Sequence, residues 1–459
     1  ALRFQAIGAR DKAGFDFPED SDFVQQDPAL SGGLEAEQYF NSQGIVYERF
    51  FSSGLSMKTG VSQLEESFEF SIGQGNFIDA KSNRYGVRSQ FIYPMSLSHE
   101  LQFGAEYSEQ NINYKGRFSA PPCDEFSSDC RLVTATEELT GSGNFAIREF
   151  NANLADQWDV LPGWQVTPGV LASYNEFTEN SYLEPRLNSR VRVALPLTWT
   201  LGFGEYHALS GNPGQYTPEF GNPEINETRS THYETGLEYQ LKDGLNLTSE
   251  LYYKDITDIV VSRVPQNNYP GLTTEEYNAL PRYTNDGSGQ SWGIETLLNA
   301  DYSDRWYGWV SLTLSRTERS NDITGENFRY SYDKPIVINA VGNYRWNDRW
   351  TFGLKWRYES GQLVTPLDGV EEDTETPGLF NPIYGDPFSE RLPAYHRLDF
   401  RADRAYQFSR WSMDLYFEVI NLYARENVVG YRYLNADYSE REDVNDLPPI
   451  ASFGVRMVF

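Results

Sequence analysis

Long apolar runs and basic residues are both scarce in this chain of 459 residues. No stretch approaches the roughly 18 consecutive apolar residues that a membrane-spanning helix needs, which excludes a helical membrane protein. Lys and Arg together number 38 against 66 Asp and Glu, so the formal net charge is −28. Nucleic-acid binding requires a basic face, and this acidic balance argues against it.

Residues that carry catalysis or bind metals are also few. There are four histidines, they are far apart in the sequence, and none forms an HExxH motif or a closely spaced metal-binding pair. A GxSxG match occurs at 289–293, but it lies within an alternating, strand-like segment and not at the strand-to-helix turn that a nucleophile elbow needs, and no glycine-rich phosphate loop stands out. The sequence therefore predicts neither an enzyme nor a bound metal or cofactor.

The chain has two cysteines, Cys123 and Cys130, in a stretch rich in Pro, Ser and Asp. This composition predicts an exposed loop. A disulfide between the two, which we favour, would imply an oxidising compartment such as the periplasm or the cell surface. The alternative is a pair of free thiols.

Aromatic residues, by contrast, make up 15% of the chain. Many lie in segments where apolar and polar residues alternate, such as 350–358 and 411–419. Period-two alternation predicts strands with one apolar and one polar face, whereas a helix would space its apolar residues three and four apart. A chain that is polar on average can still cover a lipid face if only alternate residues touch lipid.

The connections between these segments are of two kinds that alternate along the chain. Tight turns are predicted at 161–164, 242–244, 303–306, 347–350 and 408–411. Long polar segments are predicted at about 14–42, 112–140, 208–230, 260–290, 360–394 and 424–449. Strict alternation of short and long connections would place all the large loops at one end of the sheet. Outer-membrane barrels have this polarity, with short periplasmic turns and long extracellular loops.

Half of the tryptophans occupy a common level, at the start of the strand that follows a short turn. They are Trp164, Trp199, Trp306, Trp350 and Trp411. Tryptophan favours the membrane–water interface, so a periplasmic aromatic girdle explains the placement better than a soluble core does. The sequence thus predicts an all-β fold, a single antiparallel transmembrane β-barrel over residues 1–459 with about eighteen strands.

If the apolar faces meet lipid, the polar faces line a charged lumen. Two interpretations remain open: the charges hold a plug or guide a polar solute, or they pair across strands and keep the interior wet. The charges predicted to face the lumen include Arg190, Arg192, Arg397, Asp399, Arg401 and Asp403.

The last segment, 452–459, resembles the C-terminal assembly signal of bacterial outer-membrane proteins. Gly454, Met457 and the terminal Phe459 fit that signal, although Met457 is not aromatic. The closing strand must offer an edge to the barrel assembly machinery and an apolar face to lipid. This resemblance implies that machinery, outer-membrane lipid and lipopolysaccharide as partners.

Several stretches resemble the barrel of TonB-dependent outer-membrane receptors. The segment 221–239 is similar to the family's "NP-x-L-x-PE-x-S-x-x-YE-x-G" stretch, although Asn226 replaces the usual Pro. The segments 251–260, 285–295, 417–423 and 447–454 follow in the expected order.

The resemblance implies a plug domain inside a 22-stranded barrel, and TonB acting through that plug. No plug and no TonB-binding segment is recognisable, and about four strands are missing. The simplest explanation is that the chain is the C-terminal part of a longer receptor; a naturally plugless barrel is the alternative.

The resemblance also implies import of a scarce small nutrient, which could be an iron–siderophore, cobalamin or a carbohydrate, with the iron–siderophore as the default. Candidate ligand contacts are loop tyrosines, because Tyr buries area at low entropic cost: Tyr269, Tyr283, Tyr431 and Tyr433. The alternatives are a passive porin-like channel and, further off, a soluble all-β binding protein.

The final residue gives a first test. Replacing Phe459 with Ala is expected to impair assembly, because the closing strand would lose the aromatic end of its signal. The measurement is the amount of heat-modifiable, folded protein in outer-membrane fractions. A normal amount would contradict the assigned role.

Overall fold

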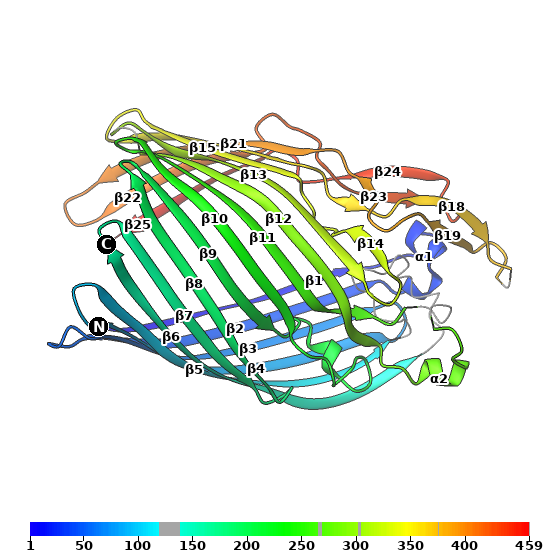
Figure 1. Cartoon of the computed structure of the whole chain (residues 1–459). Coiled ribbons are helices and arrows are strands. Elements are labelled where there is room, and N and C mark those ends of the chain that lie inside the picture. The colour runs from blue at the N-terminus through cyan, green and yellow to red at the C-terminus, as the bar shows by residue number, and fades with distance from the viewer. Residues whose placement is uncertain (119–137, 265–268, 302–303, 375, 459) are drawn as a thin grey trace.

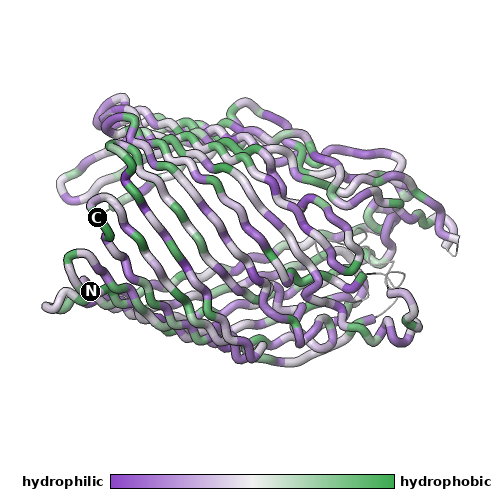
Figure 2. Tube along the Cα trace, viewed as in Figure 1, coloured by the Kyte–Doolittle hydropathy of each residue, from purple (hydrophilic) through white to green (hydrophobic). Residues whose placement is uncertain are grey.

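Long antiparallel strands form one large sheet that curves into a barrel wall (Figure 1). The computed structural model describes all residues except 119–137, 265–268, 302–303, 375 and 459. Hydrophobic and hydrophilic residues alternate along the strands (Figure 2), as expected for a sheet with lipid on one face and water on the other. No helix in the described part of the chain is long and apolar enough to cross a bilayer.

The main sheet has 19 strands. They are β1 (Leu2–Phe15), β2 (Leu34–Phe50), β3 (Ser56–Ile72), β4 (Asn76–Pro94), β5 (His99–Phe118), β6 (Leu139–Leu161), β7 (Trp164–Asn175), β8 (Asn180–Ala194), β9 (Leu197–Ala208), β10 (Thr228–Lys242), β11 (Leu245–Ser262), β12 (Tyr283–Asp301), β13 (Trp306–Asn321), β14 (Glu326–Arg329), β15 (Ile336–Arg345), β16 (Trp350–Glu359), β21 (Tyr395–Gln407), β22 (Ser412–Ile420) and β25 (Ile450–Val458).

Small elements occupy the long loops. They are the helices α1 (Asp22–Gln26), η1 (Pro28–Leu30), η3 (Pro213–Tyr216) and α2 (Thr274–Asn278), and the strand pairs β17 (Leu363–Val364) with β20 (Glu390–Arg391), β18 (Leu367–Glu372) with β19 (Phe380–Tyr384), and β23 (Val428–Leu434) with β24 (Glu440–Asn445). Helix α2 begins with a capping box between Thr273 and Glu276.

Strands that are neighbours in the sequence pair throughout the wall. β14 and β15 both pair with β13, at different heights, and so fill one position. The 19 strands therefore occupy eighteen positions, the number that the sequence predicts. β1 pairs with β2 alone and β25 with β22 alone among the described strands, so the wall is open along a seam between β1 and β25.

The two ends of the wall differ in their connections. One end carries only short turns, such as the one between β6 and β7, and the other carries the long loops. The prediction of strict alternation was wrong at two points, because 73–75 and 176–179 are tight turns at the loop end. The sequence boundaries of the first long segment were also wrong. β2 already begins at residue 34, because the strands of this part of the wall run beyond the lipid-facing zone.

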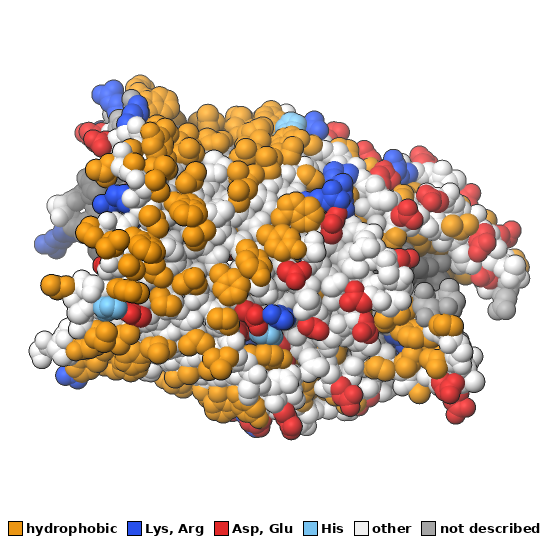
Figure 3. All heavy atoms as spheres, in the orientation of Figure 1, with side chains coloured by type: hydrophobic (Ala, Val, Ile, Leu, Met, Phe, Trp, Pro, Cys, Tyr) orange, Lys and Arg blue, Asp and Glu red, His pale blue; other side chains and the backbone are white. Residues whose placement is uncertain are grey.

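Two levels of aromatic side chains mark the membrane boundaries. Trp164, Trp306 and Trp350 are the first residues of their strands, Trp199 is the third residue of β9, and Trp411 directly precedes β22. Apolar side chains gather on the outer surface near this end (Figure 3). On the outward face of β7, Tyr174 follows Trp164 by ten residues. At about 3.4 Å per residue and a tilt of about 40°, this spans about 26 Å, close to the ~25 Å apolar band of such barrels.

The loop between β9 and β10 folds inward rather than outward. Tyr216 and Ile225 from this loop are 2% and 1% exposed, and they pack against Ile112 of β5 and Ile147 of β6. Burial of one such side chain contributes about 1.5–3 kcal/mol. The loop is therefore held against the inner wall, where it roofs part of the lumen.

The first and last long loops meet at the loop end. Gln26 Nε2 donates hydrogen bonds to the carbonyl oxygens of Tyr433 and Asn435, each at 2.9 Å. The backbone N–H of Asn435 donates to Asp22 Oδ1 at 3.1 Å. Figure 1 shows α1 beside the β23–β24 hairpin. These contacts bridge the loop end between the two sides of the seam.

The closing strand packs a glycine against a tyrosine. Gly454 of β25 lies opposite Tyr416 of β22, and a Cβ at Gly454 would overlap the Tyr416 ring. The guanidinium of Arg401 covers that ring at 4.1 Å from its centroid. Met457 lies on the opposite, outward face with Phe453, whereas the terminal Phe459 is outside the described residues.

This packing makes Gly454 sensitive to a single methyl group. Gly454→Ala should cost about 1–3 kcal/mol through overpacking. The matched control is Gly342→Ala in β15, where an added Cβ meets nothing within 4 Å. The yield of heat-modifiable barrel after refolding into detergent should fall for the first variant and stay unchanged for the second. Equal yields would show that the ring moves aside freely.

Candidate functional site

A cavity of about 540 Å³ lies on the lumen side of the wall, beneath the inward-folded β9–β10 loop. Strands β4 to β9 contribute its lining side chains, and Tyr216 contributes from the loop. Glu184 and Arg186 reach it because they alternate along β8 with Leu183 and Leu187, which are exposed on the outer face. The same inward register continues to the predicted lumen charges of β8.

The carboxylates of the cavity are already occupied. Glu227 is 6% exposed and accepts hydrogen bonds from Thr178 Oγ1 at 2.7 Å, Asn180 Nδ2 at 3.0 Å and the Tyr182 hydroxyl at 3.0 Å. A buried carboxylate with three donors is fully paired and has little capacity to bind a further cation.

Glu184, which is 2% exposed, is also engaged. It accepts from the backbone N–H of His207 at 2.7 Å and pairs with Arg186 at 3.1 Å. The His207 ring stacks on Tyr182 with 3.8 Å between centroids, and its Nδ1 lies 3.3 Å from Glu184. This network fixes the two aromatic rings at the side of the cavity.

Several N–H donors of the cavity have no partner. Arg84 makes no hydrogen bond or ion pair within the described residues, and Asn175 Nδ2 and Arg186 Nε are buried without one. Asn175 uses only its Oδ1, which accepts from the Phe177 N–H at 2.9 Å. Unused guanidinium and amide donors beside paired carboxylates favour a ligand that presents anionic or carbonyl oxygens.

Tyr216 in the roof of the cavity is held by a hydrogen bond within its own loop. The Tyr216 hydroxyl donates to the carbonyl oxygen of Ser210. Burial raises the pKa of Tyr216 well above its ordinary value, so this hydroxyl stays protonated and keeps its role as a donor.

The four tyrosines predicted as ligand contacts lie outside this cavity and are not brought together. Tyr283 is buried in the apolar cluster with Tyr216, while Tyr269 packs near Tyr277. Tyr431 lies beneath Arg441, and Tyr433 lies near Tyr438. A ligand role for them stays a prediction, and at Tyr283 it would require the buried ring to move.

Most of the predicted lumen charges form pairs. Arg397 pairs with Asp399 at 2.9 Å and Arg401 with Asp403 at 2.8 Å, in each case along β21. Arg190 pairs with Glu238 of β10. Arg192 forms no ion pair among the described residues; its backbone N–H donates to the carbonyl oxygen of Gly163. A role for these charges in guiding a solute remains a prediction, as does the disulfide of Cys123 and Cys130, which lies outside the described residues.

Residues of the cavity were accessible to sequence reasoning only in part. Side chains two residues apart share one face of β8, so Glu184 and Arg186 are expected to face the same way as Arg190. Nothing in the sequence indicates that Arg84 and Asn175 lie near them, because that depends on pairing across β4 to β8. Within the described residues, no group of His, Cys, Asp and Glu side chains is arranged to hold a metal ion.

Comparisons with known proteins agree with this architecture. The family model described as "TonB dependent receptor-like, beta-barrel" matches residues 4–422. No curated protein sequence matches the chain significantly.

Solved structures share the fold at low identity. The ferric enterobactin receptor of Pseudomonas aeruginosa has a TM-score of 0.67 at 16% identity, over 99% of this chain and 66% of its own. The ferripyoverdine receptor of the same organism has a TM-score of 0.68 at 12% identity, over 99% and 62%. The outer-membrane transporter YddB of Escherichia coli has a TM-score of 0.64 at 11% identity, over 99% and 66%.

The chain therefore spans less than two thirds of the length of these three proteins. The family model matches most of the residues of the chain, which therefore belongs to the TonB-dependent receptor-like β-barrel family of the bacterial outer membrane.

Proposed function

We propose that the chain forms most of the barrel of a receptor that imports a scarce nutrient in a TonB-dependent way. The observation that carries this proposal is the family match over residues 4–422. The lumen cavity supports it, because its free donors face the route that a solute would follow through the lumen.

An iron–siderophore is the nutrient that we favour. Two of the similar structures are named as receptors of ferric enterobactin and ferripyoverdine. Chelators of ferric iron present several anionic oxygens, the groups that Arg84 and Asn175 are equipped to bind. Identity to those receptors is low, so this support comes from the chemistry of the cavity together with the fold.

We further propose that other segments of the same polypeptide complete the barrel and supply a plug. The free edges of β1 and β25 carry unpaired backbone N–H and C=O groups, which lipid cannot satisfy. Eighteen positions leave room for about four more strands in a barrel of about 22. The greater length of the similar receptors is consistent with this arrangement.

The test measures uptake of a labelled ferric siderophore by cells that express the receptor from its whole reading frame. Uptake should stop when TonB is deleted. Continued uptake, or a large conductance of the whole receptor in planar bilayers, would favour a passive channel and overturn the proposal.

Arg84→Gln tests the cavity in the same assay. Loss of a charged hydrogen bond should raise KM about tenfold or more and leave the maximal rate near that of the wild type. The control is Arg88→Gln, two inward positions further along β4, where the guanidinium lies 3.6 Å from Glu106 and outside the cavity. Equal KM values for both variants would remove Arg84 from the ligand path.

A further inference from the structure

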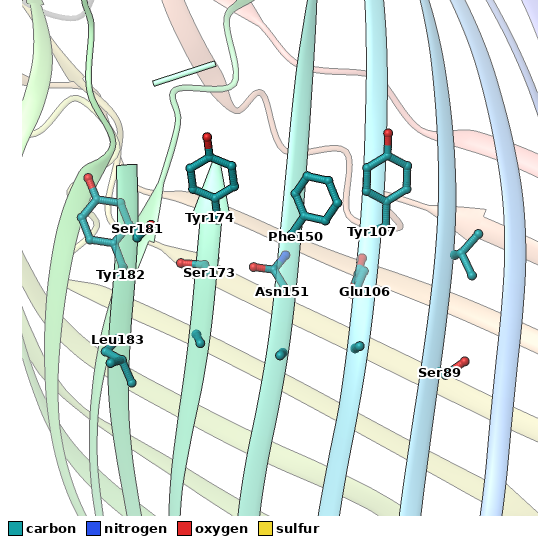
Figure 4. A pocket seen from close by; sticks show the side chains of 14 residues that line it. Ser89, Glu106, Tyr107, Phe150, Asn151, Ser173, Tyr174, Ser181, Tyr182 and Leu183 are labelled. Carbon is teal, nitrogen blue, oxygen red and sulfur yellow. The ribbon is translucent and has the colours of Figure 1, made fainter. Parts of the chain in front are cut away.

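The outer, lipid-facing surface of β4 to β8 contains a groove of about 800 Å³ (Figure 4). Small residues form its floor. Ser89 lies beside Ala105, Ala105 beside Ala152, and Ala152 beside Ala172 on successive strands. Leu183 of β8, which is 70% exposed, stands beside Ala172 and closes this end of the groove. Three strand spacings of about 4.8 Å give the floor a length of about 14 Å.

Larger side chains form both rims. On the loop side, Tyr107, Phe150 and Tyr174 stand in a row, with ring centroids 4.8 Å and 6.3 Å apart. Figure 4 shows these three rings side by side above the floor. On the other side, the next outward position holds Phe103 of β5 and Leu154 of β6. The groove is therefore one residue row wide.

A polar cluster lies directly above the aromatic row and fixes the depth of the groove. Arg148 pairs with Glu109 at 3.3 Å and with Glu176 at 2.7 Å. The Tyr107 hydroxyl donates to Glu109 at 2.9 Å. Ion pairs at this level belong to the head-group region, since the ~25 Å apolar band ends at the aromatic girdle. The groove thus lies at the top of the hydrocarbon layer, continuous with the lipid-facing surface.

The floor needs no water. The Ser89 hydroxyl is bonded to the Thr59 hydroxyl at 3.0 Å, and the other floor residues are alanines. A dry groove left empty would forfeit dispersion contacts along its whole length, so hydrocarbon is favoured to fill it.

We propose that this groove binds one acyl chain of a bilayer lipid whose head group lies beside Arg148. The acyl chain enters below the Glu109–Arg148–Glu176 cluster and lies on the alanine floor between the two rims. The β-sheet of a neighbouring protein would fit the groove less well than an acyl chain. Two packed sheets lie about 10 Å apart with their side chains interdigitated, and the protruding rims of the groove would keep a second sheet from approaching that closely. The lipid is therefore held longer than the lipids around the rest of the barrel.

The experiment uses the whole receptor, purified after expression from its whole reading frame, in phosphatidylcholine vesicles that contain a phospholipid spin-labelled near the end of its acyl chain. Electron paramagnetic resonance counts the motionally restricted lipids for each barrel. Ala152→Leu fills the middle of the floor and should lower that count by about one. The matched control, Ala340→Leu, makes the same change on the outward face of β15, beside Trp356, and should leave the count unchanged.

Two results would overturn the proposal. One is an equal number of restricted lipids in the wild type and in Ala152→Leu. The other is a wild-type dimer that Ala152→Leu separates, because the groove would then be an interface between copies. Heat modifiability checks that each variant is folded, and Ala172→Val replaces Ala152→Leu if the latter does not fold. Because the assay contains no nutrient, its outcome is independent of the proposed import.

Discussion

The absence of water in the bilayer core governs this structure. Every backbone N–H and C=O at that depth must find its partner within the protein, and antiparallel pairing of sequence neighbours provides it from β1 to β25, except along the outer edges of those two strands. The same constraint fixes side-chain chemistry. Once each strand is paired on both sides, alternate residues have only lipid or lumen to face, so an acidic chain can carry an apolar outer surface.

That constraint also explains which parts of the fold can be predicted from the sequence. Period-two alternation in segments such as 350–358 predicts strand, face and neighbour together, because each depends on residues close in the sequence. The level of Trp164 and Trp306 follows in the same way from the turns that precede them. The number of strand positions was therefore predictable. The placement of Arg190 and Arg397 in the lumen rests on the same alternation and stays a prediction.

Features that depend on contacts between distant segments could not be predicted. The inward fold of the β9–β10 loop results from packing of Tyr216 and Ile225 on Ile112 and Ile147, residues from other strands. Tyr283 has the composition of an exposed loop contact, yet the same cluster buries it. The free donors of the lumen cavity are likewise a property of an assembled site, since Arg84 has no partner only because of what surrounds it. The tight turn at 73–75 is an exception to the predicted alternation of short and long connections. The height of a connection above the membrane is set by the length of the strands that it joins, which the alternation does not indicate.

The contact of Gln26 with the carbonyl oxygens of Tyr433 and Asn435 has a mechanical consequence. It joins the two sides of the open seam at the loop end of the wall, whereas β1 and β25 are not paired with each other below it. The circumference of the outer mouth is thus set by two loops, whatever fills the gap below them. The mouth can widen only if the contacts between those two loops break, so the contacts limit its circumference.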